Sequence, residues 1–136
     1  MTTVYELRLD TDFIAHVQKA TRTTQEFGIE PTHGLFGSPE WWEHISSGTL
    51  PVHHLRGTIS RVYMGSMNDW PEFTFRSEAG EESNWSRYGN SPALAAHYAV
   101  GRSIELDYVL QRHRPKSFDG GAEHKIPIEI RIQEIA

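Results

Sequence analysis

The loop MGSMNDWPEF, residues 64–73, has the clearest capacity for binding chemistry in this sequence. Asn68 and Asp69 are good turn formers, and Pro71 restricts Trp70 to an extended backbone. A tryptophan at a loop tip with a carboxylate beside it could contact a protein or a small polar ligand. Alternatively, the ring packs on the rest of the fold while the carboxylate bonds local N–H groups. We expect the Trp70 ring to fold back and Asp69 to face solvent.

A second candidate surface comes from Trp85, Arg87 and Tyr88 in the segment EESNWSRYG. Residues two apart on a strand share a face, so Trp85 and Arg87 point one way and Tyr88 points the other. The alternative role of this surface is packing across strands. The candidate binding residues are therefore Asp69, Trp70, Trp85 and Arg87.

Catalytic and metal motifs are not found among the eight histidines or the serines. His53 and His54 are adjacent on a predicted strand and point to opposite faces, so they do not bind one ion together. No histidine pair has the i, i+4 spacing of a helical zinc site, and there is no G-x-S-x-G elbow. The glycines of DGGAEHK, residues 119–125, lack the spacing of a phosphate loop and indicate a hairpin connection. The sequence predicts no catalytic residue, no metal and no cofactor, and favours a non-enzymatic role.

The segment GSPEWWEHISSG, residues 37–48, predicts a short helix with two adjacent tryptophans. Ser38 is a good N-cap and is followed by proline at the first helical position. At about 100° per residue, Trp41 and Trp42 flank Ile45 on one stripe, opposite the carboxylates. We expect all three side chains to be buried as a packing wedge. The alternative is a lid whose indole N–H groups face a cavity.

Composition and charge exclude several classes of function. The formal charge is −5, so the total charge does not support binding to nucleic acid phosphates or anionic lipid. The absence of cysteine excludes disulfides and thiol chemistry. No long apolar run or signal peptide is present, so we expect a soluble, cytoplasmic protein without a membrane partner. The one basic run, QRHRPK at residues 111–116, could contact an acidic surface or be a solvated strand end.

Periodicity then indicates the elements that position these residues. Alternation over residues 5–9 predicts a short strand, and apolar steps of three and four predict a helix over residues 12–27. A long strand follows residue 51, with a bulge near Ser60 or Arg61 where the apolar parity changes. Later segments predict strands at 73–76, 81–89, 103–110 and 126–132 and a short helix within 91–99, the last two strands each with one wet face.

This order predicts an α+β fold. The expected architecture is a small, mostly antiparallel five- or six-stranded β-barrel of OB type, with an N-terminal helix and a short Trp-rich helix. Residues 1–50 would form a helical part packed on a barrel of residues 51–136, together one domain. Residues 66–73 would join the first two barrel strands, at the usual binding surface of such barrels.

A resemblance rests on the segments GLFGSPEWWEHISSG and GTISRVYMGSMNDWPEF, between Gly34 and Phe75. They resemble segments of small uncharacterised bacterial proteins with an OB-like barrel. The resemblance implies a bacterial source and a barrel, and it implies no activity.

Three functions are consistent with the sequence. The preferred hypothesis is a binding module that engages a protein or a small polar ligand through residues 66–73. The second is a small enzyme with Asp69 or a histidine as acid or base, which the lack of a recognisable acid–base pair disfavours. The third is single-stranded nucleic acid binding on the barrel face by aromatic stacking, which the negative charge disfavours.

Overall fold

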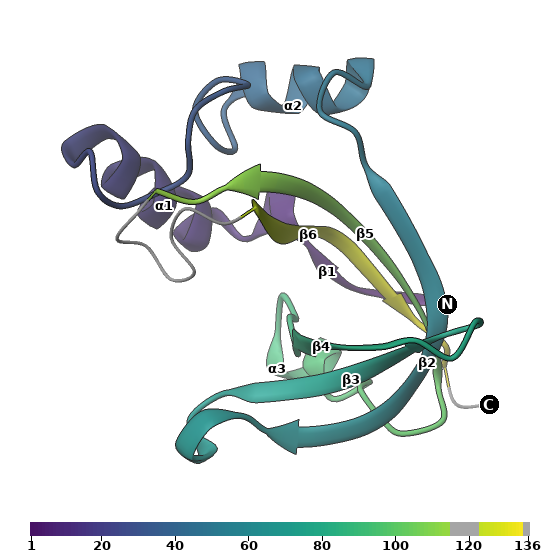
Figure 1. Ribbon diagram of the computed structural model, residues 1–136. Coiled ribbons are helices and arrows are strands. Elements are labelled where there is room, and N and C mark those ends of the chain that lie inside the picture. The colour runs from purple at the N-terminus through teal and green to yellow at the C-terminus, as the bar shows by residue number, and fades with distance from the viewer. Residues whose placement is uncertain (115–122, 135–136) are drawn as a thin grey trace. The chain divides into compact units, whose positions relative to one another are not determined.

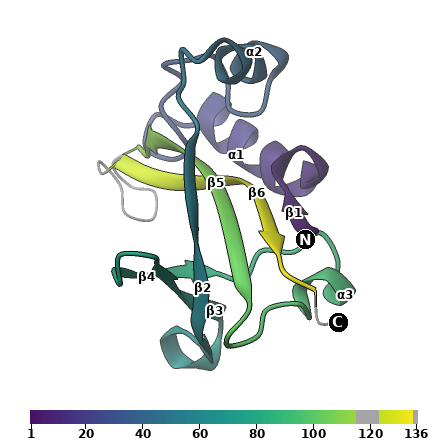
Figure 2. The ribbon, with the colours of Figure 1, turned by 90° about the vertical axis from the view of Figure 1, so that its right-hand side faces the viewer.

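The computed structural model describes residues 1–114 and 123–134. The predicted fold class is confirmed: the fold is α+β, with a six-stranded antiparallel sheet in the order β1-β6-β5-β2-β3-β4, whose strands are labelled in Figure 1. β2 pairs with β5 on one side and with β3 on the other, and Figure 2 shows β2 beside β5. The strands are β1 (Thr2–Glu6), β2 (His53–Met64), β3 (Pro71–Ser77), β4 (Glu82–Ser86), β5 (Ser103–Arg112) and β6 (Glu123–Ile132). The helices are η1 (Leu7–Leu9), α1 (Thr11–Thr23), α2 (Pro39–Ser47), η2 (Ser66–Asn68) and α3 (Pro92–Ala95).

The chain divides into two compact units, and each has its own buried apolar residues. The first unit comprises Met1–Glu6, His54–Asp107 and Ile128–Ala136, and the second comprises Leu7–His53 and Tyr108–Pro127. The grouping into one domain of residues 1–50 and 51–136 stays a prediction. The core of the first unit includes Val4, Tyr5, Ile59, Phe73, Phe75, Trp85, Tyr98, Ile104, Leu106, Ile130 and Ile132. That of the second includes Leu7, Val17, Ile29, Phe36, Trp41, Leu50, Val109 and Ile126.

The predicted bulge in β2 is confirmed. The pairing of β2 with β3 shifts register between Ile59 and Arg61. Ile59 is fully buried, whereas Arg61 is exposed. Because β2 has one extra residue at this point, odd-numbered side chains face the core before the bulge and even-numbered side chains face it after the bulge, as the change in apolar pattern indicated.

The N-terminal elements are shorter than predicted. β1 ends at Glu6, and a 3-10 turn replaces the expected strand at Leu7–Leu9. α1 ends at Thr23 instead of residue 27, and Thr24 is extended. The hydroxyls of Thr21, Thr23 and Thr24 donate to backbone carbonyls four residues earlier. Such bonds compete with the helical ladder, which accounts for the early end.

The predicted helix at residues 39–47 is confirmed with both of its ends. The hydroxyl of Ser38 accepts a hydrogen bond of 3.2 Å from the backbone N–H of Trp41. Gly48 ends the helix with φ of +80°, the left-handed conformation that glycine adopts without steric cost.

The wet face predicted for β5 extends only over its first half. Ile104 and Leu106 are fully buried, as expected. Beyond Asp107, however, Val109 and Gln111 are buried although they share its parity. The second half of β5 belongs to the second unit, in which a different set of side chains packs on it.

Candidate functional site

The turn between β2 and β3, residues 64–70, is named here the β2–β3 tip. It is closed by backbone bonds of 2.6 Å from Gly65 N–H to the Trp70 carbonyl and 2.9 Å from Asn68 N–H to the Gly65 carbonyl. Met67 and Asn68 have φ of 57° and 60°. Asparagine tolerates this left-handed conformation, whereas a methionine in it is uncommon. The backbone of the tip is thus a compact turn with one strained residue.

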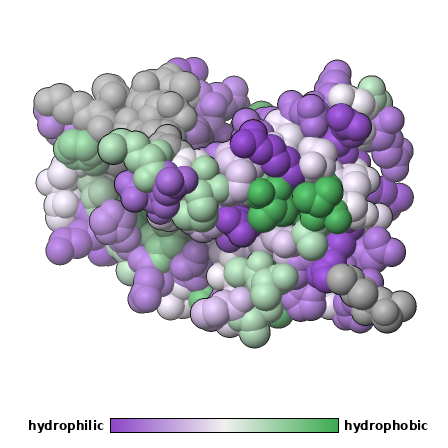
Figure 3. Space-filling view, turned by 90° about the horizontal axis from the view of Figure 1, so that it is seen from below, coloured by the Kyte–Doolittle hydropathy of each residue, from purple (hydrophilic) through white to green (hydrophobic). Residues whose placement is uncertain are grey.

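The β2–β3 tip carries apolar side chains to the surface. Met67 is 90% exposed, Trp70 is 55% exposed and Met64 is 44% exposed. Figure 3 shows one face of the molecule as largely hydrophilic, with apolar side chains gathered in a few separate patches. Methionine and tryptophan are enriched at protein interfaces, so the tip has the composition of a contact surface.

Trp70 is anchored at its edge while its ring remains open to solvent. Its indole N–H donates a hydrogen bond of 2.6 Å to the hydroxyl of Ser86 on β4. The expectation that the ring folds back onto the barrel holds only for its N–H edge, because more than half of the side chain is exposed. Asp69 is exposed as expected, and its carboxylate has no hydrogen bond or ion pair with any residue of the described part of the chain.

Arg87 lies at the base of the tip, and Trp85 lies in the core. A guanidinium nitrogen of Arg87 donates to the carbonyl of Tyr63 at 3.1 Å and lies 3.5 Å from the sulfur of Met64. Trp85 is only 7% exposed, and its indole N–H donates to Ser83 at 2.8 Å. The structure thus brings three predicted site residues to the tip, and the burial of Trp85 favours the packing alternative for its ring. Their roles in binding stay predictions.

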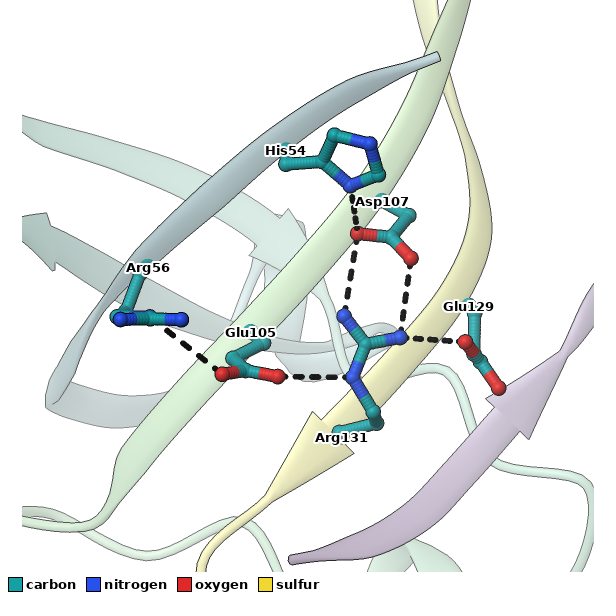
Figure 4. A network of polar contacts seen from close by, with 6 residues as sticks. All are labelled: His54, Arg56, Glu105, Asp107, Glu129 and Arg131. Atoms are coloured by element: carbon teal, nitrogen blue, oxygen red, sulfur yellow. Dashed lines mark hydrogen bonds and ion pairs between the residues drawn. The ribbon is translucent and has the colours of Figure 1, made fainter.

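A network of ion pairs on β2, β5 and β6 is the most polar feature of the first unit (Figure 4). Arg131 makes two hydrogen bonds to Asp107, of 2.9 and 3.1 Å, and one of 2.9 Å to Glu105. It also pairs with Glu129. His54 lies 2.6 Å from Asp107, and Arg56 lies 3.4 Å from Glu105. This network was not predicted from the sequence, although its members alternate with apolar residues on their strands.

The electrostatics of this network stabilise the charged forms of its members. Burial acts to raise the pKa of Asp107, but hydrogen bonds from Arg131 and His54 and their charges outweigh it and hold that pKa below its ordinary value. The bond to Asp107 is the main cause that raises the pKa of Arg131. The network borders an open hollow of about 560 Å³ that also touches Glu78. Its carboxylates are engaged by arginines, so the arrangement is that of a surface ion cluster.

The tryptophans of α2 form an aromatic cluster in the second unit. Trp41 is fully buried, with ring centroids 4.8 Å from both Phe36 and Trp42. Its indole N–H donates to Gln111 at 2.8 Å. Trp42 and Ile45 are only partly buried, so the prediction of three buried residues holds for Trp41 alone. Trp42 is partly exposed beneath the guanidinium of Arg8, 3.8 Å from the ring centroid.

The basic run at residues 111–116 has a structural role in its described part, residues 111–114. Residues 115–116 lie outside the described residues, as do residues 119–122 of the predicted connection at 119–125. Gln111 is buried rather than solvated. Arg114 donates to the carbonyls of Thr21, at 2.9 Å, and Thr24. A cation at the last carbonyls of α1 complements the negative end of the helix dipole.

A second apolar surface lies in the second unit, formed by α1 and residues outside this helix. Phe13 and Phe27 are 37% and 42% exposed. They border a hollow of about 290 Å³ with His16, Val17, Ala20, Gly28, Ile29 and His113. These side chains are less exposed than Met67 of the tip, so the tip offers more apolar surface per residue to a partner.

Within residues 1–114 and 123–134, no group of three or more His, Cys, Asp or Glu side chains is placed to hold a metal ion. No helix in the same residues has the length and apolar character needed to cross a membrane.

Comparison with known proteins identifies the family. The model of the family described as Immunity protein RhsI2 matches residues 1–133. The chain belongs to the RhsI2 immunity protein family. Its resemblance to uncharacterised proteins with an OB-like barrel is corrected by this assignment. No curated protein matches the sequence.

Proposed function

We propose that this protein binds and neutralises a cognate Rhs toxin, and that the β2–β3 tip is a principal contact. The observation that carries the proposal is the family match, which extends over residues 1–133. An immunity role requires recognition of another protein and no chemical step. This agrees with the preferred hypothesis of a binding module and narrows its ligand from a protein or small polar molecule to a protein.

The tip supports the proposal through its exposed side chains. Met67 and Trp70 leave much of their apolar surface in water, which is unfavourable unless a partner covers it. Trp70 is held by its bond to Ser86, and Arg87 is held by its bond to Tyr63. Less conformational entropy is lost when such pre-ordered side chains bind, so they are suited to be anchors.

The other hypotheses have less support. Asp69 has no described partner that could relay a proton, as an acid or base would need. The carboxylate of Asp107, beside His54, is held by two bonds from Arg131. For nucleic acid binding, the first unit has ten carboxylates and six arginines in its sequence, a formal charge of −4. Repulsion from phosphates opposes that function.

The experiment is complex formation with the toxin domain of the cognate Rhs protein, together with rescue of bacteria that express it. We expect a one-to-one complex in calorimetry and restored growth on co-expression. A toxin domain that neither binds the purified protein nor loses toxicity in its presence would overturn the proposed function.

The contact surface is tested by Met67→Ser combined with Trp70→Ser. Loss of anchor residues costs about 2 kcal/mol or more, so we expect at least about thirtyfold weaker binding. Val100→Ser is the matched control, because Val100 is 65% exposed in the same unit but lies outside the tip. Equal affinities of the two variants would exclude the tip while leaving the immunity role in place.

A further inference from the structure

The sheet has two edge strands, β1 and β4, and their outward backbone groups differ in how far they are hydrogen-bonded. An edge strand presents unpaired N–H and C=O groups that can pair with another chain. Both edges lie in the first unit, so they can be compared directly.

The edge at β1 is closed by Asn90. The backbone N–H of Asn90 donates to the Val4 carbonyl at 3.0 Å. Its side-chain oxygen accepts from the Glu6 N–H at 2.7 Å, and its side-chain nitrogen donates to the Glu6 carbonyl at 3.1 Å. One residue thus bonds three backbone groups of this edge, on Val4 and Glu6.

The edge at β4 is open. Backbone bonds from Ser77 to Glu81 and from Arg87 to Pro71 fix which pairs of the β3–β4 ladder are hydrogen-bonded. Antiparallel pairs alternate, so Ser83 and Trp85 direct their backbone groups to β3, and Glu82, Asn84 and Ser86 direct theirs away. Among the described residues, only Tyr88 bonds any of these outward backbone groups, at the Ser86 carbonyl.

The side chains of β4 hold this open edge in an extended form. The carboxylate of Glu82 accepts a bond of 2.8 Å from Ser60, and the amide oxygen of Asn84 accepts one of 2.8 Å from Thr74. Both residues are exposed. The strand is therefore pre-ordered for pairing, which lowers the entropy cost of binding a partner.

We propose that β4 is a docking strand, on which an extended, basic segment of the toxin adds as a seventh strand beside Glu82–Ser86. This inference rests on the proposed function. Unpaired, extended backbone is complementary to another extended segment. Glu78 and Glu81 in the turn before β4, and Glu82 at the start of the strand, are exposed in a unit of charge −4, so a basic segment is attracted and a second copy of this acidic chain is repelled.

The docking strand is continuous with the β2–β3 tip. The bond from Trp70 to Ser86 joins the exposed indole to the last residue of β4. A segment paired along β4 would therefore reach Trp70 at the end of the strand, which makes the edge and the tip one surface.

The test compares Asn84→Pro with Asn84→Ala. Both variants lose the side-chain bond to Thr74, but only proline removes the outward N–H and places a ring at the open edge. We expect the alanine variant to bind the toxin domain within about threefold of wild type and the proline variant to bind at least about tenfold more weakly. A folded proline variant that binds as well as the alanine variant overturns the docking strand.

Amide hydrogen exchange provides the second readout, which holds even if the proline variant does not fold. In the wild-type complex, the outward N–H groups of Asn84 and Ser86 should gain protection, whereas those of Ser83 and Trp85 are already bonded in the free protein. Unchanged exchange at residues 84 and 86 in a formed complex overturns the docking strand and leaves the immunity role intact. Absence of any complex with wild-type protein overturns the immunity role itself.

Discussion

The indole N–H of Trp41 donates a 2.8 Å hydrogen bond to the side-chain oxygen of Gln111, 70 residues later, and both residues are buried. The amide nitrogen of Gln111 has no hydrogen-bond partner in the described residues. A buried donor that loses its acceptor costs about 1 to 3 kcal/mol. This pair therefore links the aromatic cluster of α2 to β5 in a way that can be measured.

We predict an energetic coupling of about 1 to 3 kcal/mol between Trp41→Phe and Gln111→Leu. Each single change leaves the other polar group without its partner, whereas the double change removes both. The free energies of unfolding of wild type, both singles and the double variant, from urea melts, give the coupling. Strictly additive effects would show that the bond contributes nothing beyond packing.

The two adjacent tryptophans should differ in their contribution to stability. Trp41 is fully buried, so Trp41→Ala should cost about 3 to 5 kcal/mol. Trp42 is partly exposed under Arg8, so Trp42→Ala should cost less than about 3 kcal/mol. Denaturant melts of the two variants check the order, and an equal loss would mean that Trp42 is as well packed as Trp41.

Trp70 and Trp85 provide a matched pair of tryptophans in the first unit. Trp70→Ala removes a largely exposed ring and should change the free energy of unfolding by about 0.5 kcal/mol or less, as should Asp69→Asn. Trp85→Ala removes a buried ring and should cost about 3 to 5 kcal/mol. A loss above about 2 kcal/mol for Trp70→Ala would place its ring in the core after all.

The Asp107–Arg131 pair should make stability depend on pH in the acid range. The folded-state pKa of Asp107 is lowered, so its contribution is complete above the unfolded-state pKa of about 3.9 and is lost as pH falls through the folded-state value. We expect Asp107→Asn to be less stable than wild type at neutral pH, with a difference that shrinks below about pH 4. Urea melts across this range measure it. Asp69→Asn, at an exposed carboxylate without a described partner, is the control and should show no such trend.

Asn90 should be required for the stability of β1. Asn90→Ala removes both side-chain bonds to the Glu6 backbone, and we expect a loss of about 1 to 3 kcal/mol. Asn90→Asp keeps an acceptor for the Glu6 N–H but places a carboxylate oxygen against the Glu6 carbonyl, so it should also be less stable than wild type. Thermal melts of the three proteins test both expectations, and a neutral Asn90→Ala would show that water satisfies this edge equally well.

The sequence by itself determined those structural features that depend on residues close together in the chain. Ser38 and Gly48 define the ends of α2, and the change of apolar parity predicts the bulge at Ile59–Arg61. Each of these features depends on backbone groups or side chains that are close in the chain. The α+β class followed from the same alternation and periodicity. The exposed position of Asp69 followed from its place in a turn.

Only the tertiary structure decided which faces meet. Three sets of contacts join segments that are distant in the sequence. They are the hydrogen bond of Trp41 to Gln111, the hydrogen bonds between Asn90 and the backbone of Glu6, which are 84 residues apart, and the ion pairs of Arg131. The same holds for Trp70, whose exposure depends on how β3 pairs with β4, and for the buried second half of β5. Alternation in the sequence specifies that one face of a strand is apolar, but the free energy gained by burying that face depends on which side chains of other segments pack on it. For this reason, only the folded structure shows that β4 pairs on one side, with β3, and that its other edge is open.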